Sequence, residues 1–296
     1  MDFRKYIQAV NKEFENNGRS ELFVKAEQAV IDTGNPIMMV EFASGVKNGA
    51  DIEALANAVI ASKNSSCIYA FARDVKGANI KPLEEAIIKN KDTSYVIEFI
   101  KHIDGANVEL LQQFIIDSKY VKGCIQIANA CASKEGVDLI KLGKLVAKYG
   151  TAEDIYNFST ASLFVDRALM QQAIINRADP EYLYKFSHMA SDFKGLEQAM
   201  INSGSAQYCY YFAMANKKSD VLALQKAVMK TGELNYCISF ANNIEGADIE
   251  AVYNMIKNNP KYHYQAEDMK ERIIRKRHSN KSELEQMITI MNTDKL

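Results

Sequence analysis

The chain has 296 residues, of which 48% are hydrophobic and 25% charged, and its formal net charge is −1. Such a composition is too apolar for a disordered protein, and the balanced charge provides no overall field that would attract nucleic acid or an anionic membrane. The sequence has no apolar leader at its start and no run of about 18 apolar residues that could span a bilayer. We therefore expect a cytoplasmic protein that does not interact with membranes.

In chain order, the first expected element is an N-terminal capping helix within residues 1–19. A repeat array follows over residues 20–260, in which an apolar anchor residue recurs with a period of about 28 residues. The anchors are Phe42, Phe71, Phe99, Ile127, Phe158, Phe186, Phe212 and Phe240. Around Phe99 and Phe240, for example, apolar residues lie four and three positions before the anchor and one and four positions after it, as on one face of an α-helix. The pattern predicts an all-α fold, an α-solenoid of about eight helical hairpins with helical caps at both ends.

A second series of residues marks where the second helix of each hairpin begins. Its members are all Asp or Asn, whose side-chain oxygen accepts hydrogen bonds from the free N–H groups of a helix start. They are Asp51, Asn79, Asn107, Asp138, Asp166, Asp192, Asp220 and Asp248. The spacing from each cap to the next anchor is the same throughout the array, whereas the spacing from an anchor to the cap that follows it varies. The turn inside each hairpin is therefore the variable one, and variable turns gather on one rim, often the binding rim.

Glycine and proline support these boundaries. Gly34, Gly150, Gly204 and Gly232 follow second helices, where a left-handed residue often ends a helix. Pro82 lies three residues after the cap Asn79, in a first turn where its missing N–H is expected to cost little.

Residues 261–296 depart from the repeat and are expected to form a C-terminal helical cap. The sequence predicts a helix to about Arg277 and a short one after Ser282, which with Glu285 matches a capping box. The segment is rich in cations, namely Lys270, Arg272, Arg275, Lys276, Arg277 and Lys281. These belong either to a solvated helix or to a contact with nucleic acid or an acidic partner.

Over residues 20–260 the chain resembles α-solenoids built from helical hairpins, the class that includes tetratricopeptide, HEAT and armadillo proteins. The resemblance lies in the architecture and not in a diagnostic motif, and the period of about 28 residues is shorter than in those families. It implies binding, usually of proteins or peptides along the concave face and sometimes of nucleic acid.

The sequence carries no pattern of a familiar enzyme. A glycine-rich phosphate loop, a nucleophile elbow and a paired-carboxylate motif are all missing, and the four histidines are scattered. The five cysteines have no metal-ligand spacing and are expected to be small buried apolar residues. We expect no enzymatic activity, no metal and no cofactor.

The residues two positions before the anchors form a further row, which includes several tyrosines. Either they stack neighbouring repeats together, or they form a binding face, because tyrosine is common at binding hot spots. The long turn of the fourth repeat is a second candidate, either as tolerated drift or as a bend or partner-specific loop. The predicted partner-binding residues are Tyr69, Arg73, Tyr156, Tyr184, His188, Tyr210, Met214, Lys134 and Glu135.

The leading hypothesis is a non-enzymatic scaffold or inhibitor that holds a protein partner with the solenoid face and the variable-turn rim. The composition, rich in Lys, Asn and Ile, is typical of a low-GC bacterium or its phage, so an anti-defence inhibitor is one form such a protein could take. The alternative is a nucleic-acid-binding repeat protein that uses the basic C-terminal segment. The sequence leaves open the identity of the partner and the oligomeric state.

Overall fold

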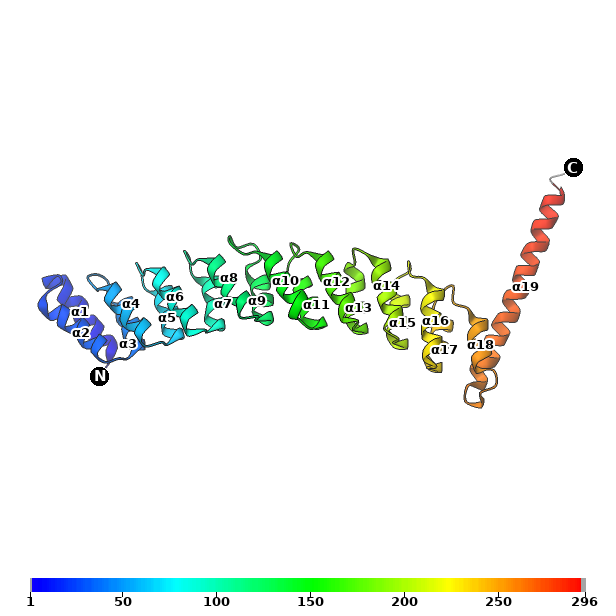
Figure 1. The fold of residues 1–296 in the computed structure, drawn as a ribbon, viewed down its shortest axis with the longest axis horizontal. Coiled ribbons are helices and arrows are strands. Elements are labelled where there is room, and N and C mark those ends of the chain that lie inside the picture. The colour runs from blue at the N-terminus through cyan, green and yellow to red at the C-terminus, as the bar shows by residue number, and fades with distance from the viewer. Residues whose placement is uncertain (1, 294–296) are drawn as a thin grey trace. The chain divides into compact units, whose positions relative to one another are not determined.

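The structure, a computed structural model, describes residues 2–293, and the side chains of these residues other than 281, 286 and 288–293. Within this part of the chain the fold is all-helical, with 19 α-helices, two short 3-10 helices and no strand (Figure 1). Helices that follow one another along the chain pack in neighbouring pairs, which is consistent with an α-solenoid. None of the described helices is long and apolar enough to cross a lipid bilayer.

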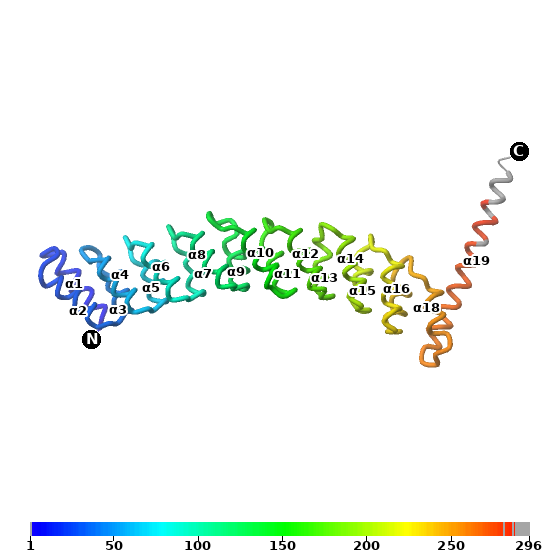
Figure 2. The backbone as a smooth tube through the Cα atoms, viewed as in Figure 1, coloured from blue at the N-terminus to red at the C-terminus, as the bar shows by residue number. Residues whose placement is uncertain are grey.

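The chain divides into two compact units, Met1–Leu169 and Met170–Leu296, and each is described by itself. In the first unit, successive hairpins lie side by side in chain order (Figures 1 and 2). Its helices are α1 (Phe3–Asn17), α2 (Glu21–Asp32), α3 (Pro36–Gly45), α4 (Ile52–Ala61), α5 (Ser65–Asp74), α6 (Ile80–Asn90), α7 (Thr93–His102), α8 (Val108–Asp117), α9 (Val121–Cys131), α10 (Leu139–Tyr149) and α11 (Ala152–Ala161). Helix α12 (Arg167–Arg177) begins at the end of this unit.

The second unit continues with hairpins of the same kind and ends in a long helix. Its elements are α13 (Pro180–Phe186), η1 (Ser187–Met189), α14 (Phe193–Asn202), α15 (Ala206–Ala215), α16 (Val221–Thr231), α17 (Leu234–Asn243), α18 (Ile249–Ile256), η2 (Pro260–Tyr262) and α19 (His263–Thr293). We call the odd-numbered helices α3 to α17 the first helices and the even-numbered helices α4 to α18 the second helices.

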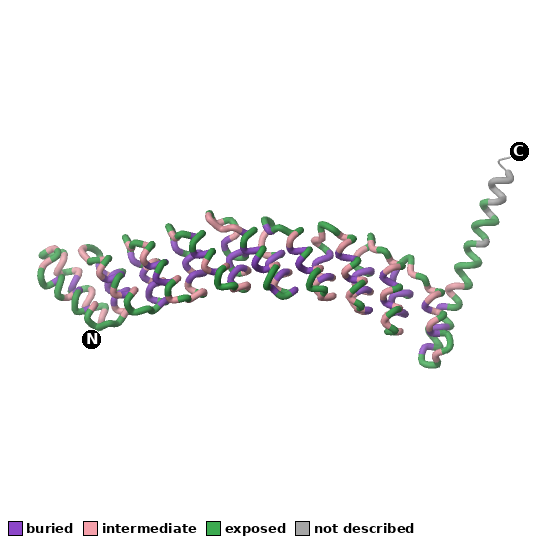
Figure 3. The backbone as a smooth tube through the Cα atoms, in the orientation of Figure 1, coloured by how far each residue is buried: buried purple, intermediate pink, exposed green. Residues whose placement is uncertain are grey.

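The core of each unit lies between the first and second helices, where buried residues line the facing sides (Figure 3). All eight predicted anchor residues are fully buried, from Phe42 to Phe240. Burying one aromatic side chain of this size removes about 150–250 Å² from water, so the anchors are the largest regular contribution to the core. The five cysteines are buried as well, as predicted from their positions on the apolar stripe.

Seven of the eight predicted cap residues accept a hydrogen bond at the start of a second helix, in each case from the N–H three residues later. Examples are Asp51, which accepts from Ala54 at 2.9 Å, and Asn107, which accepts from Leu110 at 3.0 Å. Asn79 is the exception, and its side chain makes no cap hydrogen bond. The residue three positions later is Pro82, which has no N–H to donate. The proline that was expected to cost little therefore removes the partner of the cap.

A series of buried Glu and Gln side chains ties six of the eight caps to the preceding even-numbered helix, and the sequence analysis missed it. Glu84 on α6 accepts from the backbone N–H of Asn107 at 2.9 Å, and Gln225 on α16 accepts from that of Asp248 at 2.7 Å. We call each such bond a rung. Its side chains are Glu27, Glu84, Gln112, Gln171, Glu197 and Gln225.

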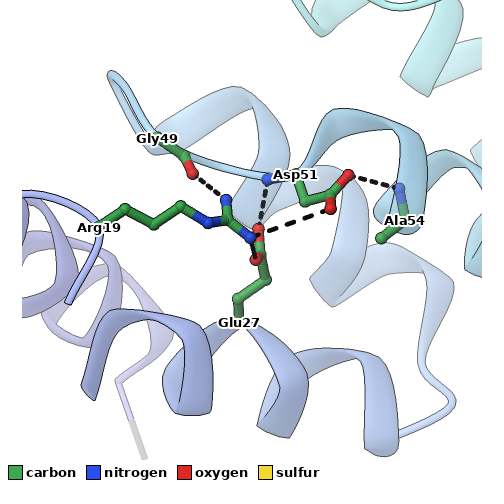
Figure 4. Close-up of polar contacts among 5 residues, drawn as sticks. All are labelled: Arg19, Glu27, Gly49, Asp51 and Ala54. Atoms are coloured by element: carbon green, nitrogen blue, oxygen red, sulfur yellow. Dashed lines mark hydrogen bonds and ion pairs between the residues drawn. The ribbon is translucent and has the colours of Figure 1, made fainter. Parts of the chain in front are cut away.

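Figure 4 shows the first rung, which an ion pair reinforces. Glu27 accepts from the backbone N–H of Asp51 at 2.6 Å, while Arg19 lies 2.8 Å from its other carboxylate oxygen. Arg19 also donates to the carbonyl oxygen of Gly49, so the turn before α4 is fixed at both ends. A buried carboxylate needs such partners, because an unpaired charge in the core would cost several kcal/mol.

One expected helix-end conformation and one expected helix boundary are wrong. Gly150 ends α10 with φ −71°, outside the left-handed region, whereas Gly34, Gly204 and Gly232 do adopt positive φ. A side chain at Gly150 would place its Cβ 2.6 Å from the carbonyl oxygen of Val146, so the glycine is required by a close approach. The C-terminal segment is one continuous helix, α19, and not two, because no glycine or proline between Arg277 and Ser282 breaks it.

Candidate partner-binding surface

The second unit carries a cluster of tyrosine rings on its first helices α13, α15 and α17. Tyr184 lies 6.3 Å from Tyr208 and 6.1 Å from Tyr211, measured between ring centroids. Tyr210 continues the cluster, at 5.6 Å from Tyr211 and 6.3 Å from Tyr236. We call these five residues the tyrosine belt. All five are half-buried, so each ring packs against its neighbours and still presents part of its surface to solvent.

Polar contacts hold parts of the belt in place. The hydroxyl of Tyr210 accepts a hydrogen bond from Nδ2 of Asn243 at 2.9 Å. Burial, with the neighbouring carboxylate of Glu181, raises the pKa of Tyr208. Glu181 in turn pairs with Lys185 at 2.6 Å. Rings held by such contacts lose little further freedom when a partner covers them, which favours binding.

The predicted residues of this unit gather at the belt. Tyr184 and Tyr210 are members, and the ring of His188 lies 6.1 Å from that of Tyr184. His188 is exposed but lies in the 3-10 turn η1, because α13 ends at Phe186, earlier than the helical pattern predicts. Met214 is 53% exposed, near the end of α15. The stacking and binding interpretations of this row are therefore compatible, since rings that stack between neighbouring helices also remain accessible.

Three belt members, Tyr208, Tyr211 and Tyr236, were missing from the predicted surface. Tyr208 and Tyr236 lie four positions before the anchors Phe212 and Phe240, a position that the sequence analysis assigned to the inward stripe. Their hydroxyl groups are the signal that could have corrected this assignment, because a buried tyrosine needs a partner for its O–H.

In the first unit, Tyr69 and Arg73 lie together on α5. The guanidinium of Arg73 lies 5.2 Å from the centre of the Tyr69 ring and forms two hydrogen bonds to Asp74, at 2.7 and 2.8 Å. These hydrogen bonds lower the pKa of Asp74. Tyr69 also packs 6.0 Å from the next anchor, Phe99, so here the row stacks neighbouring helices. Tyr156, on α11, is half-buried.

Two predicted partner-binding residues, Lys134 and Glu135, lie in the long turn of the fourth predicted repeat, and Lys134 fixes this turn. The ammonium group of Lys134 donates to the carbonyl oxygen of Ile100 at 2.6 Å, which satisfies a free carbonyl near the end of α7. Lys134 thus supports the turn against the preceding hairpin. Glu135 beside it is exposed and open to contact from solvent.

Most of the basic residues of α19 are neutralised by nearby carboxylates. Lys270 pairs with Glu267 at 3.3 Å and Arg275 with Glu271 at 3.0 Å along the same helix. Two others reach acidic residues as well, since Arg272 lies 3.8 Å from Asp268 and Arg277 lies 2.8 Å from Glu250 on α18. Lys276 is exposed, and the side chain of Lys281 lies outside the described residues.

Metal-binding side chains are not clustered among the described residues. No three His, Cys, Asp or Glu side chains among them converge as a metal site would require. Burial raises the pKa of the Cys124 thiol to about 12 and that of Cys209 to about 11, which disfavours the nucleophilic thiolate. Grooves lie between successive second helices, and they differ in the charge of the residues that line them.

Comparison with known proteins does not extend these observations. No protein-family model, no curated protein and no solved structure matches this chain.

Proposed function

We propose that the chain is a non-enzymatic α-solenoid of about eight helical hairpins that holds a protein partner with the exposed sides of its first helices. The tyrosine belt is the observation that carries this proposal. Five half-buried rings on three successive first helices combine a large apolar area with hydroxyl groups at the surface, and residues of this type dominate binding energy at protein interfaces. An inhibitor of another protein would use the same surface.

The alternative, nucleic-acid binding through the C-terminal segment, has less support. Phosphate binding relies on cations that can replace the condensed counterions of the nucleic acid. Four of the six predicted cations are already paired with carboxylates, at distances from 2.8 to 3.8 Å. Each of these pairs would have to open, or carry its negative charge into the complex.

The experiment begins with a pull-down of the full tagged chain from a lysate of the source organism or its host, with and without nuclease. A protein partner that is enriched in both samples is then purified for affinity measurements. We expect Tyr184→Ala combined with Tyr211→Ala to weaken its affinity by about tenfold or more, because truncating a hot-spot aromatic residue costs about 2 kcal/mol or more.

The matched control is Tyr253→Ala, which truncates a half-buried tyrosine on the second helix α18. It is expected to leave the affinity unchanged, and circular dichroism checks that each variant keeps its helix content. If the double variant is folded and binds as tightly as the original chain, the belt is not the binding surface. Enrichment that disappears with nuclease would instead favour the nucleic-acid alternative.

A further inference from the structure

The groove between the second helices α8 and α10 combines an apolar floor with a ring of lysines. It measures about 460 Å³, and Ile116 and Leu145 lie among its lining residues. Among the described residues that line this groove, Asp117 is the only acidic one. All the lysines of the groove are exposed, so a ligand in it can reach their ammonium groups. They are Lys119, Lys141, Lys144 and Lys148, of which Lys141 also lies 3.6 Å from Asp138.

Two equivalent grooves elsewhere lack this charge. The groove between α4 and α6, of about 880 Å³, has two lysines that are matched by Glu85 and Asp92. The groove between α14 and α16, of about 840 Å³, has Lys226 and Lys230 against Glu233. All three lie between successive second helices. The positive charge at α8 and α10 is therefore a local property of these two helices and not of the repeat.

Tyr149, at the end of α10, lies within this positive field. The ammonium group of Lys148 lies 5.0 Å from the centre of its ring, and that of Lys119 lies 5.4 Å from it. A hydrogen bond from Lys148, together with the charges of both lysines, lowers the pKa of the Tyr149 hydroxyl. The aromatic side chain is 45% exposed, so it forms an accessible wall of the groove beside the cations.

We propose that this groove binds an acidic segment of a protein partner, with one apolar side chain of the segment against Ile116 and Leu145 and flanking carboxylates against the lysines. The charge of the lysines requires an anionic ligand, and the apolar floor favours a peptide over a nucleic-acid backbone, whose phosphates would leave that floor uncovered. The inference rests on the proposed protein-binding function and adds the chemistry of the bound segment.

The test uses the full chain and a fluorescein-labelled peptide of twelve residues, with one central leucine among aspartates and glutamates. Fluorescence anisotropy is expected to show saturable binding that weakens as salt is added. Replacing the leucine by serine in the peptide should weaken binding severalfold, because the apolar floor then loses its partner. A labelled oligodeoxythymidine of twelve nucleotides is the competing probe and should bind more weakly than the peptide.

The decisive variants carry equal changes of charge at two different grooves. Lys144→Glu with Lys148→Glu should lower the affinity for the peptide by tenfold or more. Lys226→Glu with Lys230→Glu, in the groove between α14 and α16, should change it by less than twofold. All four positions are exposed on helices, so both variants are expected to fold, and circular dichroism verifies this.

Three results would overturn the proposal: no binding of the leucine peptide, equal loss in both double variants, or tighter binding of the oligonucleotide. The Tyr184→Ala/Tyr211→Ala protein is measured beside them, to separate this proposal from the proposed function. It should bind the peptide normally. If the belt variant keeps its affinity for the partner while the leucine peptide binds the groove, only the belt proposal is rejected. If the belt variant loses that affinity while the peptide does not bind, only the groove proposal is rejected.

Discussion

At the scale of single residues, each rung links a buried side chain to a cap residue that itself accepts a hydrogen bond at the start of a second helix. A Glu or Gln on a second helix accepts from the backbone N–H of the next cap residue, and the cap residue accepts from its own helix. Glutamine does more than glutamate here, because Gln225 also donates from Nε2 to the carbonyl oxygen of Asp248 at 2.7 Å. An ionised glutamate can only accept.

Glu197 is the rung at which this difference can be measured. Burial raises its pKa, although its hydrogen bond from the backbone N–H of Asp220 acts in the opposite direction. A carboxyl group with a raised pKa is more easily protonated in the folded chain than in the unfolded one. Its contribution to stability is therefore full at acidic pH and is lost as the pH rises through the folded-state pKa.

We accordingly expect Glu197→Gln to stabilise the chain at pH 7, by about 1 kcal/mol if the amide gains a hydrogen bond to Asp220. The gain over the original chain should shrink at pH 4, and urea unfolding at the two pH values measures both. Glu27→Gln is the control, because it breaks the ion pair with Arg19 and should bring no gain at pH 7. A gain at Glu197 that is equal at pH 4 and pH 7 would contradict the role of its ionisation.

The caps offer a second comparison, between two asparagines in the same position of neighbouring hairpins. Asn107→Ala should cost about 1 kcal/mol, because the N–H of Leu110 loses its acceptor. Asn79→Ala should cost only a few tenths of that, because Pro82 leaves the Asn79 side chain without a cap hydrogen bond. Thermal unfolding of both variants gives the comparison, and equal losses would show that Asn79 stabilises the chain in another way.

At the scale of elements, the described side chains of α19 are buried only near the start of the helix. Ala266 and Met269 are buried against the preceding elements, whereas every described side chain from Arg275 onward is exposed. The sequence predicted an interruption before Ser282 because serine and glutamate at that spacing match a capping box. A capping box only offers a helix start, however, and it does not end the helix that precedes it.

We predict that backbone amides at residues 278–287 exchange with deuterium much faster than those at residues 266–272. A helical segment without tertiary packing is only marginally stable in water, so its hydrogen bonds open often. Hydrogen exchange followed by mass spectrometry resolves the two segments. Equal protection would mean that the exposed part of α19 is covered in solution, and sedimentation analysis would then test for a second copy of the chain.

At the scale of the molecule, the all-helical architecture could be predicted because the local signals agreed. The anchors, apolar stripes and caps each indicate helices at the same places, and the eight anchors are indeed fully buried. The rungs could not be predicted in this way. Five of the six rung side chains lie five positions after a cap, where a Glu or Gln looks like any polar residue on a helix until the next cap is placed beside it in space.

The surface was predictable only in part, for a similar reason. The spacing identified Tyr184 and Tyr210 but could not show that Tyr208, Tyr211 and Tyr236 pack around them, since these contacts join different helices. It also grouped cations of α19 that the fold pairs with acids, and it did not join Lys119 to the three lysines of α10, because the whole first helix α9 separates them in the sequence. Charge patterns along a chain are a poor guide to charge in space.

The rungs also bear on how such a chain could be cut and rejoined. Each rung spans one intervening first helix, as from Glu84 on α6 to the amide before α8, so removing one whole hairpin brings a new second helix opposite a new cap. The polar bonds close again wherever the retained helix supplies Glu or Gln. Helices α4 and α10 have Ala56 and Gly143 at that position and form no rung in the present chain, so a splice after either helix neither breaks nor closes one. For lineages that lengthen or shorten by unequal crossing-over, the number of rungs therefore follows the number of retained helices that carry Glu or Gln, and not the point of the splice.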